Sequence, residues 1–76
     1  MTPQVLVNRT YRPGYEWLKD ETLNQRVVQI KDLLKGRGRV LIRASGTEPL
    51  IRVMVESENK SEAEIFAREL ADLIPQ

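Results

Sequence analysis

The stretch that decides the fold is residues 40–55, which read VLIRASGTEPLIRVMV. Its two ends are rich in β-branched and other apolar residues, and its centre contains Gly46 and Pro49. Apolar runs of this kind, separated by glycine and proline, are typical of two strands joined by a turn. The stretch therefore predicts a β-hairpin with a polar loop between its strands.

The register of this hairpin decides which side chains share a face. Because side chains alternate along a strand, pairing of Ile42 with either Ile51 or Val53 places Arg43 and Arg52 on the same face. The β-branched face is expected to form the core and comprises Val40, Ile42, Ile51, Val53 and Val55. The mixed face is expected to meet a ligand or another domain and comprises Leu41, Arg43, Leu50, Arg52, Met54 and Glu56.

The loop and its borders collect groups that bind an anion. Arg43 and Arg52 supply planar guanidinium donors, Ser45 and Thr47 supply hydroxyls, and Gly46 lets a ligand approach the backbone closely. These residue types suit a phosphate group. The residues alone also allow a surface turn with two solvated arginines, since glycine and serine are ordinary turn residues. Neither common glycine-rich phosphate pattern, Gly-x-x-x-x-Gly-Lys or Gly-x-Gly-x-x-Gly, is present.

The flanking segments predict one further strand and two helices. Residues 5–7 read as a strand, and a first helix is expected from the N-cap Asp20 to Lys35, with Gly36 just beyond its end. A single apolar stripe marks its buried side and comprises Leu23, Val27, Ile30 and Leu34. A second helix is expected to begin at Ser61, in a capping box with Glu64. Its core stripe comprises Ala63, Phe66, Ala67, Leu70, Leu73 and Ile74.

The order of elements predicts the fold class. In a β-α-β-β-α chain with the third strand in the middle, the sheet is antiparallel and both helices cover its β-branched face. The sequence thus predicts one α+β two-layer domain over residues 1–76. Three aromatic residues between the first strand and the first helix, Tyr11, Tyr15 and Trp17, are expected to pack over the helix-free face.

Composition narrows the possible functions. The 76 residues are 41% apolar and 30% charged with a net charge of +1, which is typical of a small globular domain. Without cysteine or histidine, the chain has no thiol nucleophile, no thiolate metal site and no imidazole base. There is no apolar run of membrane-spanning length and no signal-peptide pattern, so a cytoplasmic protein is expected.

Residues 39–56, RVLIRASGTEPLIRVMVE, resemble the phosphate-binding loop and flanking strands of the α-D-phosphohexomutases, and are most similar to those of bacterial phosphoglucosamine mutases. In that family the segment belongs to the fourth and last domain, which has a TATA-box-binding-protein-like fold. The resemblance assigns phosphate binding to Arg43, Ser45, Gly46, Thr47 and Arg52. It leaves Glu48 as a possible supporting carboxylate.

The resemblance also implies an activity for the longer protein. Phosphoglucosamine mutases are isomerases that interconvert glucosamine 6-phosphate and glucosamine 1-phosphate. The family's phosphoserine, its Mg²⁺ site and its sugar-reading loop lie in the other three domains. This chain is therefore expected to carry no catalytic residue, metal or cofactor, and to be inactive alone. Its expected partners are the sugar phosphate and those three domains, with no nucleic acid and no membrane.

Two other classes of function are compatible with the residues. The basic run from Lys35 to Arg43 would suit a small nucleic-acid-binding module, but no strand residue is aromatic, so a base-stacking sheet is missing. A protein-interaction domain would need no ligand at the loop. Within the resembling family, a phosphomannomutase or phosphoglucomutase is the alternative to a glucosamine enzyme.

Overall fold

The computed structural model describes residues 3–46 and 48–75. Its elements follow the predicted order, with one additional short 3₁₀ helix. They are β1 (Gln4–Thr10), η1 (Trp17–Lys19), α1 (Glu21–Leu33), β2 (Gly38–Ala44), β3 (Leu50–Ser57) and α2 (Lys60–Asp72). Strand β1 is longer than the predicted strand at residues 5–7, because all seven of its residues pair with β3.

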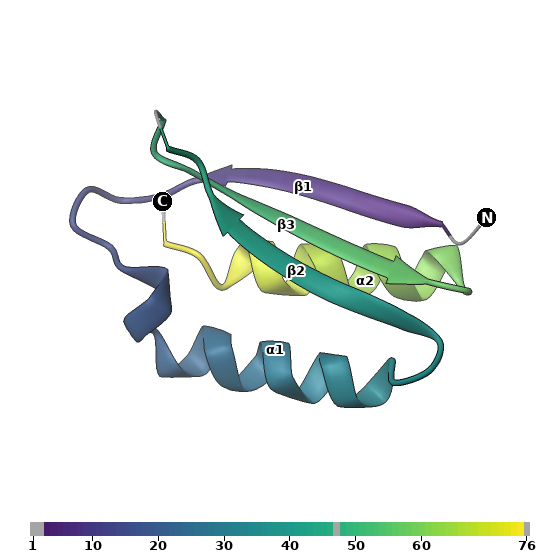
Figure 1. The fold of residues 1–76 in the computed structure, drawn as a ribbon. Helices are drawn as coiled ribbons and strands as arrows, with labels where there is room; N and C mark the ends of the chain where they lie inside the picture. The colour runs from purple at the N-terminus through teal and green to yellow at the C-terminus, as the bar shows by residue number, and fades with distance from the viewer. Residues whose placement is uncertain (1–2, 47, 76) are drawn as a thin grey trace.

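The sheet has the order β1-β3-β2, and both pairings are antiparallel. Figure 1 shows both helices on one face of this sheet, while the other face carries no helix. Ile42 pairs with Val53, one of the two predicted registers. The α+β two-layer architecture is therefore confirmed, with β3 as the central strand.

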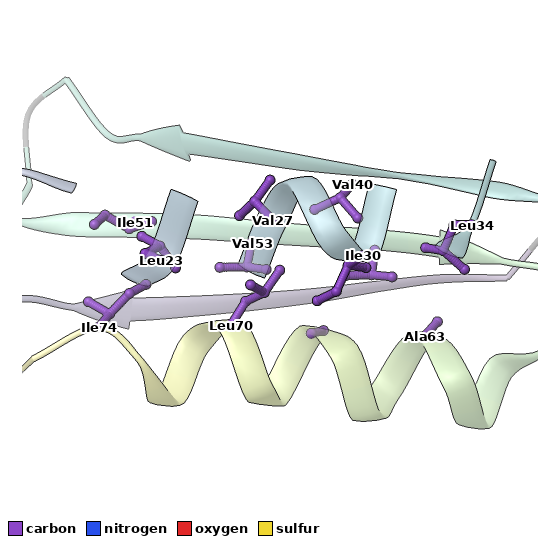
Figure 2. Packing of buried hydrophobic residues seen from close by; sticks show 12 residues of the cluster. Leu23, Val27, Ile30, Leu34, Val40, Ile51, Val53, Ala63, Leu70 and Ile74 are labelled. Carbon is purple, nitrogen blue, oxygen red and sulfur yellow. The ribbon is translucent and has the colours of Figure 1, made fainter. Parts of the chain in front are cut away.

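The core lies between the sheet and the helices, and Figure 2 shows side chains from both layers meeting there. All four residues of the predicted α1 stripe are buried, as are Val40, Ile51, Val53 and Val55 of the hairpin. On the opposite face Met54 is only 7% exposed, although it was expected on a partly open surface. It lies in the central strand between Leu6 and Leu41, and these neighbours shield it.

Helix α1 begins at the predicted cap. The Asp20 carboxylate accepts a hydrogen bond from the Leu23 backbone N–H at 3.1 Å and another from the Tyr15 hydroxyl at 2.7 Å. The Tyr15 bond and then the Leu23 bond lower the pKa of Asp20. Burial, followed by the bond to Asp20, raises the pKa of Tyr15. The helix ends at Leu33, two residues before the predicted end.

The predicted start of the second helix at Ser61 is wrong. Helix α2 begins at Lys60, and the Asn59 side chain caps it by accepting from the Glu62 backbone N–H at 3.2 Å. The cause lies at the end of β3, where the buried Ser57 hydroxyl accepts from the Asn59 N–H and donates to the Glu62 carboxylate. These bonds turn the chain into the helix before it reaches Ser61.

The three aromatic residues after β1 do not cover the helix-free face, so that expectation is wrong. Tyr11, Tyr15 and Trp17 are half-buried and pack against the core cluster instead. The Tyr15 hydroxyl reaches the α1 cap, and the Tyr11 and Tyr15 rings lie 6.1 Å apart. The segment therefore closes one end of the core, between β1 and α1 (Figure 1).

Two glycines shape the chain at the opposite end of the sheet. Gly36 has a φ of +80°, which allows the turn that leads from α1 into β2. At Gly38 a Cβ atom would overlap the backbone carbonyl of Glu56 on the central strand. Glycine at position 38 therefore allows β2 and β3 to meet at their normal separation.

Candidate functional site

A row of three polar side chains crosses the helix-free face of the sheet near the loop. Asn8 of β1 and Arg43 of β2 each lie directly opposite Arg52 of β3. All three residues are exposed. The hairpin thus brings Arg43 and Arg52 together as predicted, since neighbouring strands place paired residues on the same face.

The loop that follows β2 is held at its base by backbone hydrogen bonds. The Ser45 N–H donates to the Leu50 carbonyl at 2.8 Å, and the Leu50 N–H donates to the Glu48 carbonyl at 2.7 Å. The Tyr11 N–H donates to the Pro49 carbonyl at 3.1 Å, which ties the loop to the segment after β1. These bonds fix where the strands end and the loop begins.

Within residues 3–46 and 48–75, the Ser45 hydroxyl donates no hydrogen bond. Its Oγ accepts from the Glu48 backbone N–H at 3.4 Å, so the hydroxyl hydrogen can still be donated to a ligand. Gly46 is exposed, and a Cβ built there would meet nothing within 4 Å. The space beside Gly46 is therefore open to a ligand. Thr47, the remaining predicted loop residue, lies outside the described residues.

A hollow of about 400 Å³ lies between the row and the loop. Its lining comprises Asn8, Arg43, Ala44, Ser45, Glu48, Leu50 and Arg52. Four of the predicted residues, Arg43, Ser45, Glu48 and Arg52, therefore surround one space, whereas Gly46 is not part of its lining. Sequence reasoning missed Asn8 because the predicted first strand stopped at residue 7; the alternation along β1 would have placed Asn8 on this face.

The two guanidinium groups at the hollow are not engaged by carboxylates in the described part of the chain. Within residues 3–46 and 48–75, neither Arg43 nor Arg52 forms an ion pair. Glu48 lines the same hollow, yet its carboxylate is not paired with either arginine in that part of the chain. Two guanidinium groups, a hydroxyl and an amide side chain thus offer donors around an open space, and donors of this kind are chemically suited to an oxyanion.

Over the described ranges, no three Asp, Glu, His or Cys side chains come together in a way that could hold a metal ion. No helix in the same ranges combines the length and apolarity required to span a membrane.

Comparisons with known proteins identify the family of this chain. The sequence model of the family described as "Phosphoglucomutase/phosphomannomutase, C-terminal domain" matches residues 6–73. Phosphoglucosamine mutase from Polynucleobacter asymbioticus is 52% identical over 73 residues, covering 96% of this chain and 16% of the relative. Phosphoglucosamine mutase from Finegoldia magna is 50% identical over 76 residues, covering 97% of this chain and 17% of the relative.

Solved structures give the same result. Aspergillus fumigatus N-acetylphosphoglucosamine mutase, in complex with GlcNAc-6P and magnesium, superposes with a TM-score of 0.75 at 25% identity, covering 99% of this chain and 17% of that one. A second structure of that enzyme gives a TM-score of 0.74 at 27% identity, covering 95% of this chain and 15% of the other. The chain thus spans about one sixth of the length of the relatives it matches. It belongs to the family of phosphoglucomutase/phosphomannomutase C-terminal domains, and its most similar relatives include bacterial phosphoglucosamine mutases.

Proposed function

We propose that this chain binds the phosphate group of the substrate in a phosphoglucosamine mutase, which interconverts glucosamine 6-phosphate and glucosamine 1-phosphate. One observation carries the proposal: Arg43 and Arg52 lie directly opposite each other beside an open hollow and have no ion-pair partner in the described part of the chain. Like charges opposite each other on a sheet destabilise it. A bound phosphate dianion would relieve that repulsion.

The donors are suited to phosphate rather than to sugar. Arg43 and Arg52 supply charge-assisted hydrogen bonds, each contributing about 1.5–3 kcal/mol, and the Ser45 hydroxyl supplies one more. Gly46 and Thr47 complete the proposed phosphate loop, with Glu48 as supporting carboxylate. These groups bind the phosphate and do not recognise the sugar ring. They therefore suit an enzyme that must hold a hexose by either of its two phosphate positions.

We place the chemical steps in the rest of the protein. The proposed phosphoserine, Mg²⁺ and sugar-reading loop belong to three other domains, and these domains are the proposed partners of residues 1–76. The solved neighbour described with GlcNAc-6P and magnesium supports a sugar phosphate and Mg²⁺ for the whole enzyme. This chain alone is then a cytoplasmic substrate-binding domain without turnover, and it needs neither nucleic acid nor membrane.

Substitution of Arg43 in the full-length protein tests the proposal. Arg43→Ala should lower kcat/KM for glucosamine 6-phosphate by about 2–4 kcal/mol of transition-state binding. Arg43→Lys should recover only part, because an ammonium group lacks paired planar donors. Arg39→Ala is the matched control, since Arg39 lies on the same strand and face but pairs with Glu56 at 3.6 Å. An Arg43→Ala enzyme within twofold of wild type would refute the assignment.

Titration of the chain itself separates the competing functions. Glucosamine 6-phosphate should shift the amide signals of Arg43, Ser45, Gly46 and Arg52 with an affinity on the order of millimolar, and unphosphorylated glucosamine should not. Glucose and mannose phosphates in the full-length assay identify the alternative phosphohexomutases. A salt-dependent shift with an oligonucleotide, and none with the sugar phosphate, would instead favour nucleic-acid binding. No shift with any phosphate ligand would favour an interaction domain.

A further inference from the structure

We propose that Asn8 is a positioning residue of the phosphate site, which orients the Arg52 guanidinium and presents its own amide group to the ligand. This inference rests on the proposed phosphate-binding function. Asn8 lies on β1, directly opposite Arg52, and lines the hollow together with Arg43 and Ser45. The site is therefore built from all three strands of the sheet and not from the hairpin alone.

The contact between Asn8 and Arg52 determines which donors remain free. The Arg52 Nε–H donates to Asn8 Oδ1 at 3.2 Å. A guanidinium group has five N–H donors, so this bond leaves the four on the two terminal nitrogens. Those four can engage two oxygens of one phosphate end-on, in the paired geometry that makes arginine contacts strong. Asn8 thus determines that a ligand binds Arg52 through the two terminal nitrogens of its guanidinium group.

The same bond also sets the orientation of the Asn8 amide. Because Oδ1 accepts from Arg52, the amide NH₂ is directed elsewhere, and in the described chain it donates no hydrogen bond. Its two N–H donors are available at the edge of the hollow. Asn8 therefore adds a neutral donor to the two guanidinium groups.

The neutrality of Asn8 matters for affinity. A carboxylate at position 8 could orient Arg52 equally well, but it would form an ion pair with the guanidinium and repel the phosphate dianion. An amide oxygen orients the arginine and leaves its charge available. Arg39 shows the contrasting arrangement, because it lies directly opposite Glu56, at an ion-pair distance of 3.6 Å.

Strand β1 itself provides a matched control. Gln4 lies on the same strand and the same exposed face, and its amide donates to the Glu56 carboxylate at 2.8 Å. Both residues thus join β1 to β3 through one exposed amide hydrogen bond. Gln4 does not line the hollow. Gln4→Ala consequently removes an equivalent cross-strand bond without touching the site.

The test uses the full-length protein and glucosamine 6-phosphate. Asn8→Ala should lower kcat/KM about three- to tenfold, the effect expected from losing one or two exposed hydrogen bonds. The loss should lie mainly in KM, because the phosphate is held in the ground state as well as in the transition state. Asn8→Asp should lower kcat/KM about tenfold or more, through charge repulsion. Gln4→Ala should leave both constants near those of wild type.

A spectroscopic readout tests the positioning role without turnover. The Arg52 Nε–H signal should exchange more rapidly with solvent in Asn8→Ala than in wild type or Gln4→Ala. If Arg43→Ala is impaired while both Asn8 variants behave like Gln4→Ala, the inference about Asn8 is overturned and the proposed function survives. An Asn8→Asp enzyme more active than Asn8→Ala would also overturn it. If Arg43→Ala itself is fully active, the proposed function fails first.

Discussion

The two ends of the β2–β3 hairpin both carry arginines, but they surround them differently. Away from the loop, Arg37 lies 3.5 Å from Glu62 and Arg39 lies 3.6 Å from Glu56. Beside the loop, Arg43 and Arg52 face each other across the strands, and no ion pair involves either one in the described ranges. Arg37 and Arg39 are engaged by carboxylates of the fold, whereas Arg43 and Arg52 have no carboxylate partner in the described chain and remain available to a ligand. Residue type alone therefore does not identify the site.

The largest expected effect comes from a substitution at the end of the hairpin away from the loop. Gly38→Ala should destabilise the chain by about 3 kcal/mol, because the new methyl group overlaps the Glu56 carbonyl in the central strand. Urea unfolding measures the change as a lower midpoint at a similar slope.

Gly46→Ala supplies the control for this prediction at the loop end. A Cβ at Gly46 meets nothing within 4 Å, so stability should change by no more than about 0.5 kcal/mol. Equal losses in the two variants would show that the hairpin ends do not differ in packing.

A smaller effect is expected at the support beneath the loop. The Pro49 carbonyl of the loop accepts a hydrogen bond from the Tyr11 backbone N–H. The Tyr15 hydroxyl donates a hydrogen bond to Asp20, the N-cap of α1. Asp20→Ala should cost about 1–2 kcal/mol through loss of the cap. Thermal or urea unfolding of the chain measures this change in the free energy of unfolding. A decrease of less than about 0.3 kcal/mol would contradict a stabilising contribution from the cap.

The lowered pKa of Asp20 adds a pH dependence with a defined sign. A carboxyl group whose pKa is depressed on folding stabilises the fold above its unfolded pKa, ordinarily 3.8, and loses that contribution as pH falls through the folded value. Asp20→Asn keeps a capping oxygen but removes the charge. The stability advantage of wild type over Asp20→Asn should therefore shrink as the pH falls below about 4. A pH-independent difference would contradict this origin.

The smallest expected changes in stability have opposite signs at the two ends of β2. Arg43→Gln should stabilise the chain by about 0.2–1 kcal/mol because it removes a like charge opposite Arg52. Arg39→Gln should destabilise it by a similar amount because it removes the opposite charge facing Glu56. Both differences should fade in 1 M salt, where the screening length is about 3 Å. Changes of the same sign would contradict the contrast between the ends.

The sequence was sufficient to predict the structural features that follow from the spacing of apolar residues along strands and helices. Alternation in residues 40–55 predicted the two faces of the hairpin and placed Arg43 beside Arg52. The apolar stripe of α1 predicted which side of that helix faces the core. The order of elements and the two-layer architecture followed from these patterns. Such features are repeated over many residues, so a single misread position does not change them.

Features that depend on one hydrogen bond were harder to predict. Asn59 and Ser61 are both good helix caps, and only the turn made by Ser57 decides between them. Asn8 lies beyond the β-branched run of the first strand, so its place in the site depends on the register between β1 and β3. The aromatic segment has no period at all, and its position follows from the Tyr15–Asp20 bond.

The three-strand construction of the site has a kinetic consequence. Arg43 and Arg52 belong to neighbouring strands joined by a short loop, whereas Asn8 meets Arg52 across 44 residues of chain. Closing a long loop costs more entropy than closing a short one, and distant contacts form later in folding. The two arginines should consequently come together before the asparagine that orients one of them. Stopped-flow measurements should then find that destabilising changes in β1 mainly speed unfolding, while those in the hairpin slow folding. On this basis, the proposed site is completed only when β1 pairs with β3.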